Sequence, residues 1–507
     1  MPLPRRLPAL PPSEVPSKSK VVWETFSHQS SFQRQSYHYG TFPEDFSWGV
    51  SSSAYQIEGG WNADGKGPSV WDTYTQTPGN TLADATGDVA CDSYNRLDED
   101  IYMLRALRVK SYRFSLSWSR IFPDGTRSSL NQKDGLNYYH RLLDALKAIT
   151  LYHWDLPLEL QKVGGWENET IVQRFRDYAE VLFSRLGDKV KFWITLNEPY
   201  IVANLGYGYG TFAPGKQQYN AAHNLIKAHA EAWHLYNEKY RATQSGVISI
   251  TINSDWAEPR NPYKQEDVDA ARRYLQVEKQ MSTFEVTLFT RFFHLYCLLD
   301  GFTCQDVSCL FSKTLFFFHY RLPEFTPEEI ARINGTHDYF GLNHYTTVLA
   351  YPYDLGNRQD YEGDRSITPF GFRRLLKFIK EEYGNPSVYV TENGISERGV
   401  VDLNDVFRVH YYETYINQAR LLDGVDLKAY TAWSLMDNFE WAAGFAEQFG
   451  LFFVNRSDPN LPRSPKNSAL RYASIIKCNG FPDPGHLTFC GLWRLIWDIL
   501  EHVSRLC

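Results

Sequence analysis

The sequence predicts a single parallel (β/α)8 barrel, and two observations favour this fold class. Short apolar runs rich in β-formers alternate with amphipathic helical stretches about eight times along the chain, as in a barrel of parallel strands. No glycine-rich turn that could bind a dinucleotide follows the first strand, which argues against a doubly wound open sheet, the structural rival. The eight strand candidates are Phe46–Val50, Ser111–Trp118, Ile149–Tyr152, Val190–Leu196, Val247–Asn253, Tyr339–Thr347, Val388–Thr391 and Leu427–Ser434.

Two helices between these strands are marked by periodicity and by a following glycine. From Thr170 to Leu186 apolar residues recur at helical spacing, which gives the helix one apolar face. Gly187 is predicted to end this helix as its C′ residue, the position where helices commonly turn left-handed. The stretch 372–383 repeats the pattern and is followed by Gly384.

The chain divides into one large domain and two atypical ends. Residues 1–37 are predicted to be a disordered or loosely attached extension, 38–484 a single barrel domain, and 485–507 an atypical tail. The first twenty residues are rich in Pro, Arg and Ser and lack the apolar core of a signal peptide. The apolar stretch 487–500 is interrupted by charges and is too short to cross a bilayer. No membrane segment is therefore visible.

Three places inside the barrel domain depart from a regular pattern. The third strand begins near Ile149, almost directly after a helix that ends near Leu146, so a shortened third strand and a seam in the barrel are expected. Residues 277–320 form an unusual segment rich in Phe and Cys, and the loop 351–367 is shorter than usual for such a domain. These features put the closure of the barrel in doubt, and with it the placement of whatever follows the third strand.

Composition excludes several classes of function. The chain has 507 residues, is 43% hydrophobic and carries a net charge of −7, with Lys and Arg scattered rather than clustered, so nucleic-acid binding is not expected. Cys297, Cys304 and Cys309 lack the spacing of zinc ligand pairs, so no metal is expected. The 14 Trp and 33 Tyr side chains mostly suit core packing, although a minority would suit platforms for sugar rings. The sequence makes no prediction of an oligomeric state.

Two glutamates carry the main functional signal. Glu198, in Thr-Leu-Asn-Glu-Pro, and Glu392, in Thr-Glu-Asn-Gly, each lie at the end of a buried strand. A carboxylate there is costly to desolvate and therefore needs partners or a role in chemistry. Taken singly, Glu198 is equally well read as a capping carboxylate, and Glu392 is better read as a turn carboxylate. Taken together on one barrel, they suit the acid/base and the nucleophile of a retaining glycosidase.

Other polar and aromatic residues follow the strands in the same way. Arg113, inside the second strand, would be a buried cation in need of a carboxylate, and Glu392 is the expected partner. Gln56 follows the first strand, and its amide can both donate and accept. The remaining candidates also have a structural alternative: the histidine could be a satisfied core residue, the tryptophans could be core aromatics, and the glutamate could be a surface acid. These candidates for a sugar pocket are His153 and Trp154 after the third strand, Asn197 beside Glu198, and Trp433, Glu440 and Trp441 at the eighth strand.

The two motifs TLNEP and VTENG, with the residues above, resemble glycoside hydrolase family 1, the β-glucosidase and β-galactosidase family, over roughly residues 38–484. The resemblance implies a TIM barrel that hydrolyses β-linked glucosides and galactosides with retention and without a cofactor. It implies that Glu198 is the acid/base and Glu392 the nucleophile, with Tyr345 donating a hydrogen bond to Glu392 and Arg113 keeping it anionic. It further implies that Gln56, His153, Asn197, Glu440 and Trp441 bind the sugar and that Trp433 forms the platform beneath it.

The resemblance leaves two alternatives open. Some family relatives are receptors that have lost a catalytic glutamate, so the competing function is a catalytically impaired module that binds carbohydrate or protein. The implied location is extracellular or at the cell surface, where the three glycosylation sequons would be used, and the alternative is cytoplasmic. The sequons begin at Asn168, Asn334 and Asn455.

The retaining mechanism leads to two expectations, one for the pKa of Glu198 and one for the distance between the two carboxyl groups. Glu198 must start protonated, so burial and the nearby Glu392 anion are expected to raise its pKa. The two carboxyl groups are expected to lie about 5–5.5 Å apart, which is the retaining separation, whereas more than roughly 6.5 Å would indicate an inverting enzyme.

Overall fold

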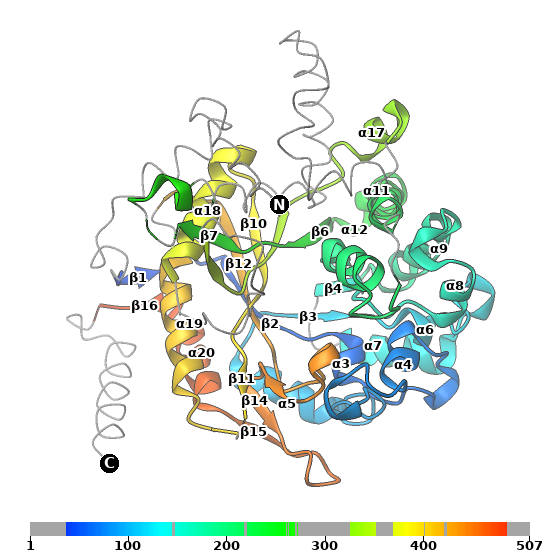
Figure 1. Ribbon diagram of the computed structural model, residues 1–507, viewed down its shortest axis with the longest axis horizontal. Coiled ribbons are helices and arrows are strands. Elements are labelled where there is room, and N and C mark those ends of the chain that lie inside the picture. The colour runs from blue at the N-terminus through cyan, green and yellow to red at the C-terminus, as the bar shows by residue number, and fades with distance from the viewer. Residues whose placement is uncertain are drawn as a thin grey trace, which may run out of the picture.

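The computed structural model describes residues 37–143, 148–216, 221–259, 261, 263–268, 271, 325–350, 369–399, 401–419 and 423–483. Within these residues eight parallel strands close into a barrel, in the order β2-β3-β4-β5-β6-β8-β10-β12 with β12 paired back to β2 (Figure 1). The (β/α)8 fold class is confirmed, and each predicted strand overlaps one of the eight. The barrel strands are β2 Ser47–Ser51, β3 Ser111–Ser115, β4 Ala148–Tyr152, β5 Phe192–Asn197, β6 Val247–Asn253, β8 Phe340–Asn343, β10 Val388–Asn393 and β12 Leu427–Trp433.

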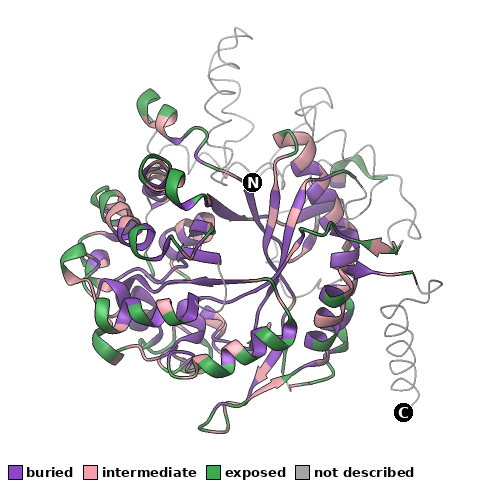
Figure 2. Cartoon of the chain, turned by 180° about the vertical axis from the view of Figure 1, so that it is seen from behind, coloured by how far each residue is buried: buried purple, intermediate pink, exposed green. Residues whose placement is uncertain are grey.

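The strands are apolar along nearly their whole length because both of their faces are covered. Parallel strands of this kind pack side chains inside the barrel and helices outside it, so successive residues are buried on either side. All five residues of β4 are buried, and five of the six in β5 are. Figure 2 shows the strands buried at the centre and the exposed residues on the outer helices.

The expected seam at the third strand is not present. β4 pairs with β3 through Phe114 and Ile149, and with β5 through Ile149 and Trp193. Residues 144–147, which precede β4, lie outside the described residues. The short connection therefore leaves β4 paired on both sides, and the expectation of a damaged third strand was wrong for the part of it that is described.

Helices surround the barrel. α9 and α11 lie together on one side, and α18, α19 and α20 lie together on the other (Figure 1). The longer helices are α5 Leu97–Leu107, α7 Asn137–Leu143, α9 Thr170–Leu186, α11 Ala221–Lys239, α17 Pro327–Ile333, α18 Pro369–Tyr383, α19 Val406–Ala419 and α20 Asn467–Cys478. Shorter ones are α3 Ala54–Ile57, α4 Val70–Thr75, α6 Trp118–Ile121, α8 Leu158–Lys162, α10 Pro199–Ile201 and α12 Arg241–Gln244.

The two predicted helices are present, but their glycines act differently. Gly384, after α18, has a φ of +72°, the left-handed conformation expected of a C′ glycine. Gly187, after α9, has a φ of −65° and is not left-handed, so that part of the prediction was wrong. A side chain at Gly187 would meet the Gln244 amide at 2.1 Å. Close packing against Gln244, rather than backbone conformation, therefore explains this glycine.

Short strands outside the barrel tie distant parts of the chain together. β1 pairs with β16 in antiparallel fashion, and Tyr37, within the predicted extension, packs its ring against Phe481. The predictions for 1–36, 277–320, 351–367 and 485–507 lie outside the described residues. The remaining strands are β1 Gly40–Thr41 with β16 Gly480–Phe481, β7 Trp256–Pro259 with β9 Thr347–Ala350, β11 Glu397–Arg398 with β13 Glu447–Gln448, and β14 Phe452–Val454 with β15 Arg463–Pro465.

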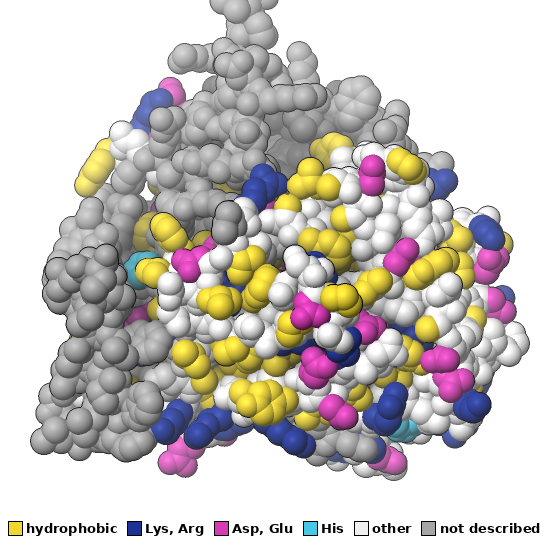
Figure 3. Space-filling model, turned by 90° about the horizontal axis from the view of Figure 1, so that it is seen from below, with side chains coloured by type: hydrophobic (Ala, Val, Ile, Leu, Met, Phe, Trp, Pro, Cys, Tyr) yellow, Lys and Arg dark blue, Asp and Glu magenta, His cyan; other side chains and the backbone are white. Residues whose placement is uncertain are grey.

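The surface shows the mixed charge expected from the composition. On the face seen in Figure 3, Lys and Arg side chains are interspersed with Asp and Glu. In the described ranges no helix has the length and apolar character needed to cross a membrane. The same ranges contain no group of three or more His, Cys, Asp and Glu side chains arranged to hold a metal ion.

Candidate active site

The predicted site residues gather at the carboxyl-terminal ends of the barrel strands, where parallel barrels carry their chemistry. Both Glu198 and Glu392 occupy such strand ends. The other residues come from different strands and the loops that follow them. Gln56 lies in α3 after β2, Arg113 in β3, His153 and Trp154 after β4, Asn197 at the end of β5, Tyr345 after β8, Trp433 at the end of β12, and Glu440 and Trp441 in the loop beyond it.

Glu392 is held by a cation and a hydroxyl. Nη1 of Arg113 forms an ion pair with Oε1 of Glu392, and the Tyr345 hydroxyl donates to Oε2 at 2.5 Å. The Arg113 and Glu392 side chains are both buried, so each charge depends on the other for compensation. Burial and the Glu392 charge raise the pKa of Tyr345 well above its ordinary value, which keeps its hydroxyl proton available for donation. The expected contact between Arg113 and Glu392 is therefore present.

Glu198 has a very different environment. It is buried, adopts a left-handed φ of +46° just before α10, and its Oε1 accepts a hydrogen bond from Nδ2 of Asn343 at 2.6 Å. Burial, followed by repulsion from Glu392, raises the pKa of Glu198 to about 8. The pKa of Glu198 is thus raised by burial and by Glu392, the direction that the sequence predicted.

Arg113 also fixes the residues around it. Its Nε donates to Oγ1 of Thr150 at 2.9 Å, and its Nη2 donates to Oδ1 of Asn197 at 2.6 Å. Because a guanidinium has only donors, the Asn197 atom facing it must be the oxygen. Nδ2 of Asn197 therefore donates to Nε2 of His153 at 3.0 Å.

This hydrogen bond determines the tautomer of His153. Burial, and then the Arg113 charge, lowers the pKa of His153 well below its ordinary value, so the ring is neutral. Since Nε2 accepts from Asn197, the ring proton must lie on Nδ1. Nδ1 is buried and has no hydrogen-bond partner in the described part of the chain. A buried N–H donor is thus left for a bound molecule.

Aromatic rings form a wall beside these polar groups. The rings of Trp154 and Trp441 lie 4.6 Å apart between centroids, and His153 stacks on Trp433 at 5.8 Å and on Trp441 at 5.9 Å. Nε1 of Trp154 donates to the backbone oxygen of Asn197 at 2.9 Å, which joins this wall to the end of β5. The wall and the two glutamates therefore belong to one site.

Glu440 supplies an acceptor at the edge of this wall. Burial raises its pKa well above the ordinary value, while hydrogen bonds from Trp433 and Gln56 oppose the shift. Its Oε1 is buried and has no hydrogen-bond partner among the described residues. A hydroxyl-rich molecule would satisfy such an atom.

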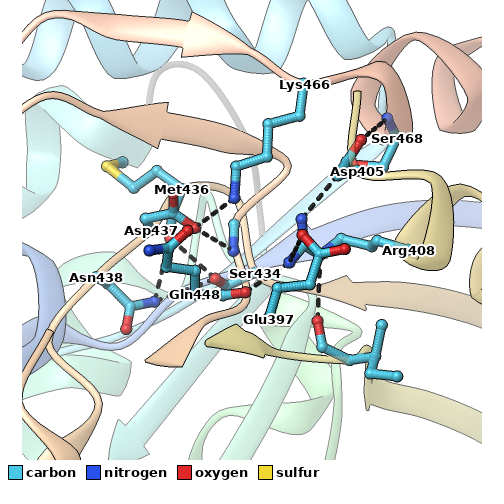
Figure 4. Close-up of polar contacts among 12 residues, drawn as sticks. Glu397, Asp405, Arg408, Ser434, Met436, Asp437, Asn438, Gln448, Lys466 and Ser468 are labelled. Carbon is cyan, nitrogen blue, oxygen red and sulfur yellow. Dashed lines mark hydrogen bonds and ion pairs between the residues drawn. The ribbon is translucent and has the colours of Figure 1, made fainter. Parts of the chain in front are cut away.

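Three groups that support the site were not predicted from the sequence. Asn343 ends β8 and contacts Glu198 directly, and its only signal was a place two residues before Tyr345. Asp255, after β6, is a third carboxyl group, and burial raises its pKa to about 7. Lys466 stabilises the loop between Trp433 and Glu440, because its Nζ donates to Oδ1 of Asp437 at 2.8 Å (Figure 4). Nothing in the sequence pattern marks Lys466.

Comparisons with known proteins give consistent matches over most of the chain. The family model for glycosyl hydrolase family 1 matches residues 38–481. Human lactase/phlorizin hydrolase is 56% identical over 479 residues, which cover 88% of this chain and 24% of that protein. The chain thus spans about a quarter of the length of that relative. Human cytosolic beta-glucosidase is 42% identical over 474 residues, which cover 87% of this chain and 98% of that protein.

Solved structures give the same result. A beta-glucosidase from Thermotoga maritima in complex with glucoimidazole superposes with a TM-score of 0.75 at 40% identity, covering 87% of this chain and 99% of that one. Aphid myrosinase superposes with a TM-score of 0.75 at 33% identity, covering 87% of this chain and 100% of that one.

Proposed function

The chain belongs to glycosyl hydrolase family 1, and we propose that it is a retaining β-glycosidase that cleaves β-linked glucosides or galactosides through a covalent glycosyl-enzyme on Glu392. The observation that carries the proposal is the unequal environment of the two glutamates. Glu392 is paired with Arg113 and Tyr345, whereas the pKa of Glu198 is raised to about 8. An anion and a neutral acid are the two species that the first step requires.

The reaction follows from these protonation states. Glu392 attacks the anomeric carbon while Glu198 gives its proton to the glycosidic oxygen, so the bond to the leaving group breaks as the bond to Glu392 forms. Esterification of Glu392 removes the negative charge that raised the pKa of Glu198. Glu198 then accepts a proton from water, which attacks the anomeric carbon and releases the sugar and the Glu392 carboxylate.

The sugar is held by the atoms that lack protein partners. The Nδ1–H of His153 donates to a sugar oxygen, and Oε1 of Glu440 accepts from a hydroxyl. Trp433 supplies an apolar platform for the C–H face of the ring. The remaining substrate-binding residues in this proposal are Gln56, Trp154, Asn197 and Trp441.

The direct test is hydrolysis of 4-nitrophenyl β-glucoside and β-galactoside, with 4-nitrophenyl α-glucoside as the matched control. We expect turnover of at least one β-substrate, none of the α-substrate, and release of the β-anomer first in proton NMR spectra. Release of the α-anomer first would indicate an inverting enzyme. Folded protein without turnover would support the alternative of a binding module, which no observation on this chain now favours. The carboxyl separation of about 5–5.5 Å remains a prediction for a crystal structure.

We also propose that residues 38–484 are the catalytic unit and that the protein is extracellular or at the cell surface. The higher identity to lactase/phlorizin hydrolase than to cytosolic beta-glucosidase supports this location, as does the exposed sequon residue Asn334. A mobility shift on glycosidase treatment of the expressed protein tests it, with Asn334→Gln as the control. Absence of a shift would favour the cytoplasmic alternative.

A further inference from the structure

The orientation of the Asn343 amide follows from the chemistry of Arg113. Arg113 only donates, so Oδ1 of Asn197 accepts from it. The same oxygen lies 3.1 Å from the side-chain amide of Asn343, and an oxygen cannot donate to it. The Asn343 atom there must therefore be Nδ2, and this same nitrogen lies 2.6 Å from Oε1 of Glu198.

The contacts at the other end of the amide agree with this orientation. The Thr391 hydroxyl donates to Oδ1 of Asn343 at 2.7 Å, and the Thr251 hydroxyl donates to Oγ1 of Thr391 at 3.2 Å. Thr251, Thr391 and Asn343 are all buried. A flipped Asn343 amide would face oxygen against oxygen at Asn197 and would leave buried groups unpaired, which costs about 1–3 kcal/mol for each group.

We propose that Asn343 is a positioning residue that occupies Oε1 of Glu198 and so places the acid proton on Oε2. This inference rests on the proposed function. An N–H that points at Oε1 leaves no room for an O–H there, so Oε1 acts as the carbonyl oxygen of the acid. Oε2 then gives its proton to the leaving oxygen in the first step and takes one from water in the second. Asn343 remains a donor to Oε1 in both steps.

Arg113 thereby connects the two glutamates. Its Nη1 pairs with Glu392, while its Nη2 orients Asn197, which in turn admits only the donor end of Asn343. The Asn343 hydrogen bond also lowers the pKa of Glu198, against the effects of burial and of Glu392. Loss of this donor should therefore misplace the acid proton and raise the pKa of the acid.

The test is Asn343→Ala assayed with two aryl β-glycosides of the same sugar, one with a phenyl and one with a 2,4-dinitrophenyl leaving group. A dinitrophenolate departs without proton donation, whereas a phenolate needs it. General acid catalysis is worth about 10²–10⁴-fold, so we expect kcat/KM to fall about 10²-fold for the phenyl glycoside and less than about threefold for the dinitrophenyl glycoside. The basic limb of the pH profile should move to higher pH.

Two further variants keep the test decisive. Thr391→Val retains Asn343 but removes the hydroxyl that orients it, and we expect a smaller loss, about several-fold, confined to the phenyl glycoside. It replaces the first variant if Asn343→Ala does not fold. Asn417→Ala is the control, because it removes an equally buried asparagine whose amide bonds the backbone of His38. It should not change the ratio of kcat/KM between the two glycosides.

Equal losses on both substrates, or an unmoved basic limb, would overturn the role of Asn343. The assay also separates this outcome from failure of the proposed function. If Glu198→Ala shows the leaving-group dependence and the Asn343 and Thr391 variants do not, only the present inference fails. If the wild-type protein turns over neither glycoside, or Glu198→Ala is indifferent to the leaving group, both fail.

Discussion

The surroundings of Glu392 and Glu198 differ although the two side chains share a fold position. Both lie at the ends of buried parallel strands, with exposures of 3% and 7%. Glu392 faces the Arg113 guanidinium and the Tyr345 hydroxyl, whereas Glu198 accepts from the neutral Asn343 amide and lies near the Glu392 charge. Burial alone therefore does not assign a role to a carboxyl group, and its partners decide which protonation state it holds.

The largest effect is expected from Glu392→Ala. Loss of the nucleophile should remove at least roughly 5 kcal/mol of transition-state stabilisation for every leaving group. Since each tenfold in rate is about 1.4 kcal/mol, kcat/KM should fall by more than about 10³-fold. Steady-state assays with an aryl β-glucoside measure this loss. Unchanged turnover would remove Glu392 from the mechanism.

A somewhat smaller effect is expected from Glu198→Ala. With a phenyl glycoside kcat/KM should fall about 10³-fold, because proton donation to the leaving oxygen is lost. With a good leaving group the first step should survive, and added azide should restore turnover by attacking the glycosyl-enzyme in place of water. A loss that is the same for all leaving groups, with no rescue, would contradict the acid/base assignment.

The raised pKa of Glu198 also predicts a dependence of stability on pH. In the unfolded chain this carboxyl ionises near 4.5, but in the folded protein only near 8. The folded state therefore loses stability as the pH rises between these values. Glu198→Gln should be more stable than the wild type by up to about 5 kcal/mol at pH 9 and equally stable at pH 4. Denaturant unfolding at both pH values measures this difference, and an equal gain at both would contradict the shift.

The smallest of these effects is expected from Tyr345→Phe. It removes one hydrogen bond to Oε2 of Glu392, and bonds to charged groups are worth about 1.5–3 kcal/mol. We expect kcat/KM to fall about 10–100-fold, with a loss of unfolding free energy no larger than the worth of this hydrogen bond. A change in the melting temperature without a change in rate would show that Tyr345 serves packing rather than Glu392.

Much of the barrel was predictable because its signals are local. Each strand is a short apolar run, and chemistry at strand ends follows from the parallel topology, which placed Glu198 and Glu392 correctly in the fold. The partner of Arg113 was predictable from the cost of an unpaired buried cation. These predictions did not require knowledge of which distant segments of the chain lie in contact.

The parts that were missed depend on contacts between distant segments. Asn343 and Lys466 gain their roles from Glu198 and Asp437, which are far away in the sequence. Gly187 was misjudged because its constraint is the Gln244 side chain, in another helix. The third strand looked weak along the chain, but its stability depends on neighbours on both sides.

Covalent trapping tests the central claim most directly. Incubation with a 2-deoxy-2-fluoro-β-glycoside that carries a dinitrophenyl leaving group should add one fluorosugar mass to the intact protein, and peptide mapping should place it on Glu392. Attachment to Glu198, or to any other residue, or inactivation without a mass change would contradict the assignment of the two glutamates.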